Sequence, residues 1–93
     1  MAKKMFRIVI ECDDVPAASG EEAATDIANE FAEHRKWYAN VRCVFDGSKL
    51  SLEAESDVDD DGQALSDEFA DCIAAYISKA FDGDLKVISV VTV

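Results

Sequence analysis

Apolar and polar residues alternate along three segments of the chain, and a fourth is almost wholly apolar or β-branched: residues 6–12, 39–45, 49–55 and 85–93. In the first segment Phe6, Ile8 and Ile10 lie on one side and Arg7 on the other. A repeat of two residues is typical of a strand with one buried face. Asp46-Gly47 separates the second and third segments, and this dipeptide between two alternating runs predicts a β-hairpin.

Two longer segments, residues 19–36 and 57–84, carry apolar residues at helical spacing. The apolar positions are Ala24, Ile27, Ala28 and Phe31 in the first segment and Leu65, Phe69, Cys72, Ile73, Tyr76, Ile77 and Ala80 in the second. Ser19 and Glu22 form the pattern of a capping box, which predicts the start of the first helix. Gly83 is placed to end the second helix.

The predicted order is β-α-β-β-α-β, which is the ferredoxin-like split βαβ arrangement of an α+β domain. We expect a single domain over residues 1–93, with two helices on one face of a four-stranded antiparallel sheet. Right-handed crossovers place the strands at 6–12 and 49–55 in the centre. The predicted core is Phe6, Ile8, Ile10, Ile27, Phe31, Val41, Phe45, Leu50, Leu52, Leu65, Phe69, Ile73, Ile77, Val87 and Val91. This fold serves unrelated functions, so it does not indicate one.

The net negative charge of the chain belongs to the predicted helices. The formal net charge is −11, and residues 19–36 and 57–84 hold fourteen of the twenty acids but three of the nine bases. The remaining residues hold six acids and six bases, so their net charge is zero. Charge this unevenly distributed bears on partners and solubility rather than on fold.

The acids of the predicted helices recur at intervals of three and four residues, so like charges face each other on one helix side, which is locally unfavourable. We therefore predict a non-enzymatic interaction module that docks on a basic, nucleic-acid-binding surface of a protein partner, as a nucleic-acid-mimicking inhibitor does. The alternative is a solvated acidic surface. The candidate docking residues are Glu22, Asp26, Glu30, Glu33, Asp60, Asp61, Asp67 and Asp71.

One motif raises a calcium alternative. Asp57, Asp59, Asp61 and Glu68 match the spacing of the EF-hand loop, in which carboxylates surround the cation. A strand precedes this segment where the motif requires a helix, so the prediction is weak binding at most. A second alternative is a small-ligand regulatory domain that binds at the loop around residues 13–20.

Neither catalysis nor direct nucleic-acid binding has support in the sequence. His34 is the single histidine, and no phosphate-binding or hydrolase motif occurs. The outward positions of the predicted central strands carry Arg7, Glu53 and Glu55 where RNA-recognition domains carry aromatic residues. We therefore predict no enzyme, no cofactor and no direct contact with nucleic acid.

The amino terminus has no signal-peptide core and no apolar run is long enough for a membrane span, so we expect a cytoplasmic protein without membrane contact. The three cysteines lie about thirty residues apart, which favours buried thiols over a disulfide. The outer face of the predicted sheet mixes Arg7 and Arg42 with Val9 and Val44. This pattern allows two interpretations: the face is covered in a homodimer, or it is solvated and carries cross-strand ion pairs.

Overall fold

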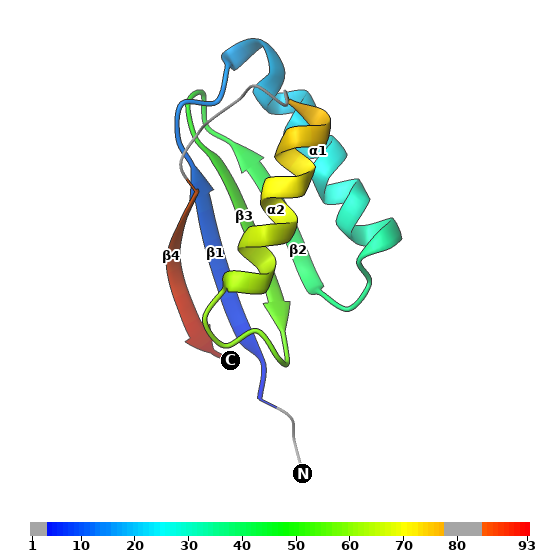
Figure 1. Ribbon diagram of the computed structural model, residues 1–93, viewed down its shortest axis with the longest axis vertical. Helices are drawn as coiled ribbons and strands as arrows, with labels where there is room; N and C mark the ends of the chain where they lie inside the picture. Colours follow the sequence, from blue (N-terminus) through cyan, green and yellow to red (C-terminus); the bar gives the residue numbers. More distant parts are fainter. Residues whose placement is uncertain (1–3, 78–84) are drawn as a thin grey trace.

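The computed structural model describes residues 4–77 and 85–93. The six elements follow the predicted order (Figure 1): β1 (Phe6–Cys12), α1 (Ala17–His34), β2 (Ala39–Phe45), β3 (Leu50–Ser56), α2 (Gln63–Tyr76) and β4 (Leu85–Thr92). The bounds of β1 and β2 are those that the alternating pattern predicts, because half-buried strands place every second side chain in the core.

The strands form one antiparallel sheet in the order β2-β3-β1-β4, so β1 and β3 are central as predicted. Both helices cover the same face of the sheet (Figure 1), which confirms the ferredoxin-like α+β arrangement. Asp46 and Gly47 turn the chain between β2 and β3. The Asp46 carboxylate accepts hydrogen bonds from the amides of Ser48 (3.2 Å) and Lys49 (2.7 Å), and Gly47 has a φ of 105°. The predicted hairpin is thus confirmed.

The core lies between the sheet and the helices. Most of the predicted core residues are buried there, and Phe6, Val41, Phe45, Ile77 and Val87 are partly buried against it. Val91 is the exception, since 47% of it is exposed. That prediction was wrong because β4 contains an irregularity. Ile10 pairs with Val87 but Val9 pairs with Ser89, so the ladder skips Ile88, and Val90 takes the inward position opposite Ile8.

The predicted helix starts are also wrong. α1 begins at Ala17 after Pro16, and no side chain caps it, so Ser19 and Glu22 form no capping box. Gly20 in the first turn lies so close to the ring of Phe45 that an added Cβ would overlap it. α2 begins at Gln63 rather than at residue 57, and the predicted end of that helix at Gly83 lies outside the described residues.

Candidate functional site

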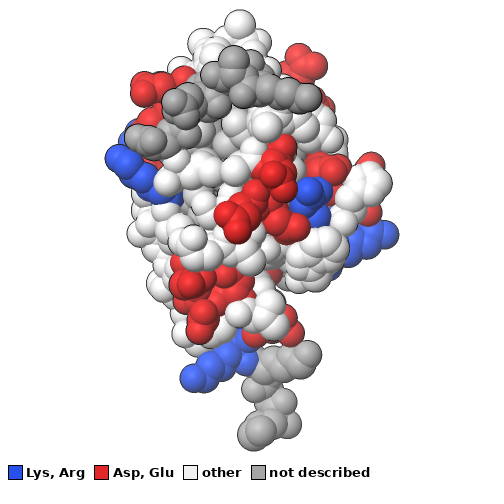
Figure 2. Space-filling model, viewed as in Figure 1, with Lys and Arg blue, Asp and Glu red and all other residues white. Residues whose placement is uncertain are grey.

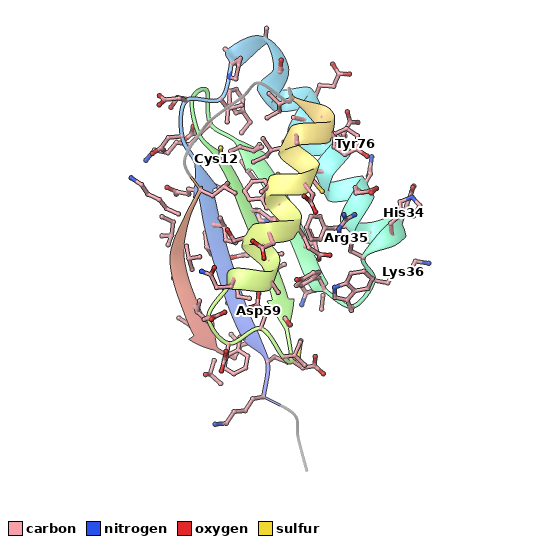
Figure 3. All side chains as sticks on the ribbon, in the orientation of Figure 1. Cys12, His34, Arg35, Lys36, Asp59 and Tyr76 are labelled. Carbon is pink, nitrogen blue, oxygen red and sulfur yellow. The ribbon has the colours of Figure 1, made fainter. Side chains whose placement is uncertain are left out.

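Arg35 joins the two helices and compensates two of their acids. It follows the last residue of α1, and Figure 3 shows it pointing into the space between α1 and α2. Its Nη1 lies 2.9 Å from Glu30 Oε1, and its Nε lies 3.4 Å from Glu68 Oε1. The guanidinium also lies over the ring of Phe31, 5.5 Å from its centroid. Glu30 on α1 and Glu68 on α2 therefore share one cation across the helix interface.

The side chains of Arg35, Glu30 and Glu68 are partly buried, and so are the groups around them. Burial lowers the pKa of Arg35, but the hydrogen bond to Glu30 and the nearby charges outweigh it, so the pKa is raised overall. Burial raises the pKa of Tyr38 to about 12, with further contributions from Glu68 and Asp59. Burial likewise raises the pKa of Cys72 to about 11, although Arg35 opposes this shift. At neutral pH these groups supply neither a base nor a thiolate nucleophile.

The segment before α2 uses its polar side chains to start that helix. Ser56 Oγ accepts the amides of Val58 (3.2 Å) and Asp59 (3.1 Å), which turns the chain at the end of β3. The buried Asp59 carboxylate then accepts the amides of Ala64 (3.4 Å) and Leu65 (2.9 Å). These are amides of the first turn of α2, which have no partner within the helix. Asp59 therefore caps two first-turn amides of α2, a role that its match to a metal motif obscured.

The structure does not bring the four calcium candidates together. Both carboxylate oxygens of Asp59 are held by backbone amides, and Asp61 Oδ1 accepts the amide of Gln63 (3.0 Å). Glu68 lies on α2 facing Arg35. No group of three acidic, histidine or cysteine side chains with metal-binding geometry occurs among residues 4–77 and 85–93. Calcium binding at Asp57, Asp59, Asp61 and Glu68 stays a prediction, and no contact in the described chain favours it.

The eight predicted docking residues differ in exposure. Asp26 and Glu30 are partly buried, and the other six are exposed: Glu22, Glu33, Asp60, Asp61, Asp67 and Asp71. Figure 2 shows acidic side chains in separate groups over α2 and the loop before it, with uncharged surface between the groups. His34, the last residue of α1, is exposed. Its Nε2 lies 3.9 Å from Glu30 and 3.8 Å from Glu33, so the imidazole lies between two carboxylates of the same helix.

Charged side chains on the outer face of the sheet pair with each other. Arg7 on β1 contacts Glu55 on β3 at 3.2 Å, and Asn40 on β2 donates to the other oxygen of Glu55 at 3.1 Å. Such pairs are expected on a solvated sheet face. They support the interpretation of this face as solvated, and a homodimer through it stays a prediction.

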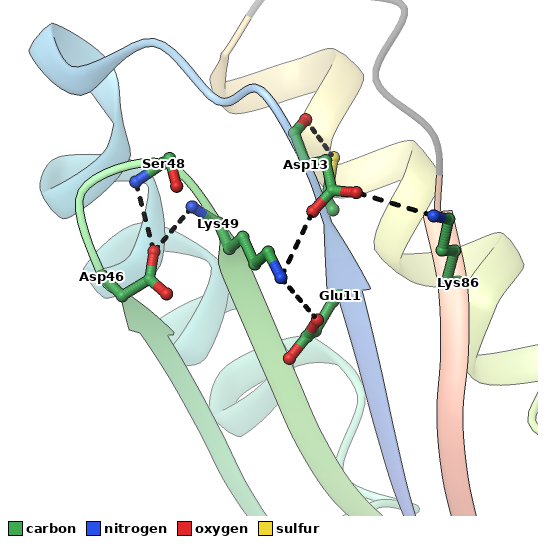
Figure 4. Close-up of polar contacts among 7 residues, drawn as sticks. Glu11, Asp13, Asp46, Ser48, Lys49 and Lys86 are labelled. Atoms are coloured by element: carbon green, nitrogen blue, oxygen red, sulfur yellow. Dashed lines mark hydrogen bonds and ion pairs between the residues drawn. The ribbon is translucent and has the colours of Figure 1, made fainter.

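A second group of ion pairs lies at the end of β1 (Figure 4). Lys49 Nζ lies 3.7 Å from Glu11 and 4.0 Å from Asp13, and Lys86 Nζ lies 3.8 Å from Asp13. The two lysines and two acids cancel in charge. Asp13 belongs to the loop that was the small-ligand candidate, and its carboxylate is already engaged by two cations. Asp14, next in that loop, has a φ of 61°, which is uncommon for a residue other than glycine.

Two features of the structure do not follow from the sequence pattern. Arg35 lies one residue beyond α1, yet it contacts Glu30 on α1 and Glu68 on α2. Trp37 and Tyr38 are adjacent in the sequence, but Trp37 is 61% exposed and Tyr38 is buried against Phe31. Helical spacing alone does not tell which of two adjacent aromatic residues turns inward.

Comparison with known proteins adds no family: no family model, no curated protein and no solved structure matches the chain. Within the described residues, neither helix has the length and apolar character needed to cross a bilayer. The three cysteines, Cys12, Cys43 and Cys72, form no disulfide.

Proposed function

We propose that this protein is a non-enzymatic interaction module, and that the acidic side formed by α1, α2 and the loop before α2 docks on a basic, nucleic-acid-binding surface of a protein partner. One observation carries the proposal. Residues 17–34 and 57–76, which form α1, α2 and the loop before α2, hold twelve acids and no lysine or arginine, whereas the rest of the chain holds eight acids and nine bases, which nearly balance. The pairs Arg7–Glu55 and Lys86–Asp13 show how that balance is achieved on the sheet side.

The contacts narrow the set of docking residues. Glu30 is engaged by Arg35 and is partly buried, so it contributes less than an exposed carboxylate does. Asp67 and Asp71 on α2 are exposed and lie one helical turn apart, about 6 Å along the axis. Glu22 and Glu33 on α1 are also exposed. Paired exposed carboxylates of this kind complement the lysines and arginines with which a protein holds phosphates.

Docking of this kind has a defined signature. Electrostatic attraction between exposed surfaces accelerates association and weakens steeply as salt rises. A solvated acidic surface without a partner lacks that signature. The single tryptophan, Trp37, is exposed and serves as a fluorescence reporter of a nearby contact.

The test is an affinity pull-down from the source cell with the protein immobilised, washed first at about 50 mM and then at about 500 mM salt. We expect a basic protein to be retained in the first wash and released in the second. The double variant Asp67→Lys, Asp71→Lys should lose it while keeping its fold, because both side chains are exposed and lie outside the core.

A matched control separates the surface from the overall charge. Asp67→Lys and Glu53→Lys change the net charge by the same amount, but Glu53 lies on the outer face of the sheet opposite Arg42. We expect only Asp67→Lys to weaken binding to the isolated partner. If both variants weakened binding equally, the effect would come from net charge and not from the position of Asp67. Retention by the double variant would show that the acidic side is a solvated surface.

A further inference from the structure

Trp37 is exposed, yet its ring is held against a core residue. It is 61% exposed and is the single tryptophan of the chain. The ring of the buried Tyr38 lies 6.1 Å from it, with 43° between the two planes. Burial raises the pKa of Tyr38, and a hydrogen bond with Trp37 acts against this shift. The indole is therefore positioned by a buried neighbour while most of it stays open to solvent.

Val58 is a second apolar side chain that the fold places in solvent. It is 79% exposed, more than any other large apolar residue of the described chain. Its amide donates to Ser56 Oγ at 3.2 Å, and the amide of Asp59 donates to the same oxygen at 3.1 Å. Ser56 and Asp59 are both buried. The loop is thus fixed by buried polar groups, and the exposure of Val58 is a property of its folded form.

Trp37 and Val58 lie beyond the same end of the β2–β3 ladder. Ala39 pairs with Glu55 at that end, so Trp37 precedes the pair by two residues and Val58 follows it by three. Figure 1 shows the loop between α1 and β2 and the loop between β3 and α2 at one end of the sheet. Single exposed apolar side chains are ordinary on a protein surface. Here two fixed ones share one end of the molecule, which we call the Trp37–Val58 end.

Negative charge flanks the Trp37–Val58 end. Residues 57–61 hold four aspartates and no base, and three of the four are exposed: Asp57, Asp60 and Asp61. Figure 2 shows acidic side chains of the loop before α2 next to uncharged surface. Lys36 is the cation adjacent to Trp37 in the sequence, and the exposed aspartates of this loop outnumber it. A group that binds here meets an aromatic ring and an aliphatic side chain beside carboxylates.

We propose that the Trp37–Val58 end binds arginine side chains of the partner, with the guanidinium stacked on the indole and its aliphatic stem against Val58. This inference rests on the docking function proposed above and names the partner group that meets the acidic side. A guanidinium is planar and weakly hydrated, so it stacks on an aromatic ring and donates to carboxylates at the same time, whereas the lysine ammonium is a strongly hydrated point charge. Tryptophan and arginine are also the residues that contribute most at protein interfaces.

The same combination of groups occurs within the molecule. The Arg35 guanidinium lies over the ring of Phe31, 5.5 Å from its centroid, and its Nη1 lies 2.9 Å from a carboxylate oxygen of Glu30. An aromatic ring beside a carboxylate thus holds an arginine in this fold. At the Trp37–Val58 end the ring is the larger indole, the carboxylates are those of the loop before α2, and the arginine would come from the partner.

The experiment measures the binding of two fluorescent peptides to the whole chain by anisotropy at about 50 mM salt. The peptides have equal length and charge, and carry either arginine or lysine at every second position with glycine between. We expect the arginine peptide to bind more tightly. Trp37→Leu should reduce this preference about two- to fivefold, the size of one exposed cation–π contact. The arginine peptide should also shift the single indole N–H signal in an NMR spectrum.

Tyr76→Leu is the matched control. Tyr76 is 40% exposed at the end of α2, the opposite end of that helix from the Val58 loop, and its replacement also leaves the net charge unchanged. We expect the preference for arginine to persist in this variant. Val58→Ser should weaken both peptides alike, because arginine and lysine both have an aliphatic stem. Trp37 and Val58 are exposed, so circular dichroism should show an unchanged fold in both variants.

The outcomes separate this inference from the docking proposal. The inference is overturned if neither peptide binds, if the preference is the same in Trp37→Leu, if Tyr76→Leu loses it equally, or if the indole signal does not move. The double variant Asp67→Lys, Asp71→Lys should weaken both peptides and keep the preference, because these acids attract charge without stacking. Docking itself is judged by the pull-down and by that double variant, so it can stand when the arginine contact fails.

Discussion

Arg35 and Glu68 contact each other across the helix interface at 3.4 Å, although they lie thirty-three positions apart in the chain. Arg35 also holds Glu30, so one guanidinium offsets the charge of a carboxylate on each helix. The second oxygen of Glu68 is buried and has no hydrogen-bond partner in the described part of the chain. Arg35 thus lies at the contact of the two acidic helices and offsets part of their mutual repulsion.

Removal of that arginine should destabilise the fold. In Arg35→Met the two partly buried carboxylates keep their charge and lose their cation, which we expect to lower the free energy of unfolding by about 1 to 3 kcal/mol. Urea unfolding followed by circular dichroism measures this loss. Glu68→Gln in the Arg35→Met background should recover part of it. Lys36→Met, at the exposed neighbouring position, should change stability by less than about 0.5 kcal/mol. Equal losses at Arg35 and Lys36 would contradict the assignment.

Asp59 should be worth more to stability than its neighbour Asp60. Asp59→Ala removes the acceptor for the Ala64 and Leu65 amides, and the loss of a helix cap costs about 1 to 2 kcal/mol. Asp60→Ala removes the same charge from an exposed position and should be neutral or slightly stabilising. Asp59→Asn keeps one acceptor oxygen and should fall between them. The urea midpoints of the three variants give the order, and a larger loss for Asp60→Ala would refute the capping role.

The same contacts bear on calcium. Because Asp59 is held by backbone amides and Glu68 by Arg35, we expect calcium at about millimolar concentration to shift the amides of residues 57–68 no more than those of Glu21 and Glu22. An NMR titration decides this. Saturable shifts confined to residues 57–68 would revive the metal site.

Truncation should destabilise the fold more at Val90 than at Val91. Val90 packs against the core and Val91 is half exposed, so Val90→Ala should cost about 1 kcal/mol. Val91→Ala should cost less than about 0.5 kcal/mol. Unfolding is measured on dilute protein, so that self-association does not contribute. A larger loss at Val91 would contradict this register, because it would mean that Val91 rather than Val90 faces the core.

Stability should fall at alkaline pH. Burial raises the pKa of Cys43 from 9.0 to about 12, that of Cys72 from 9.0 to about 11 and that of Tyr38 from 10.0 to about 12. The unfolded chain therefore loses these protons first and binds fewer of them than the folded chain does. The stabilisation is complete below about pH 9 and is lost progressively as pH rises toward the folded values.

Urea midpoints between pH 7 and pH 11 measure this loss. In Tyr38→Phe and in Cys43→Ala the decline should be shallower than in the parent protein, because one titrating group is gone. A midpoint that stays constant over this range would show that the thiols and the phenol are not protected from solvent.

What local pattern determines is visible in β1, β2 and the turn between β2 and β3. Phe6 to Cys12 and Ala39 to Phe45 have the predicted bounds, and Asp46 closes the turn through amides two and three residues away. The alternation of apolar and polar residues predicts which side chains of a strand face the core. An Asp-Gly turn depends only on contacts between residues that are close in the sequence. The order of elements, and with it the fold class, follows from such local signals and from the preferred handedness of crossovers.

What only the tertiary structure decided depends on contacts that the spacing of residues in the sequence does not reveal. Asp59 matches a metal motif by spacing, but its oxygens meet the amides of the helix that the end of β3 leads into. Arg35 becomes the shared cation of two helices only when α2 packs beside α1. The skip at Ile88 depends on how β4 aligns with β1, because a ladder of hydrogen bonds and a buried face must be satisfied together. In each case the residue takes the position that satisfies burial and hydrogen bonding for the whole fold. The order of neighbouring residues in the sequence does not show which position that is.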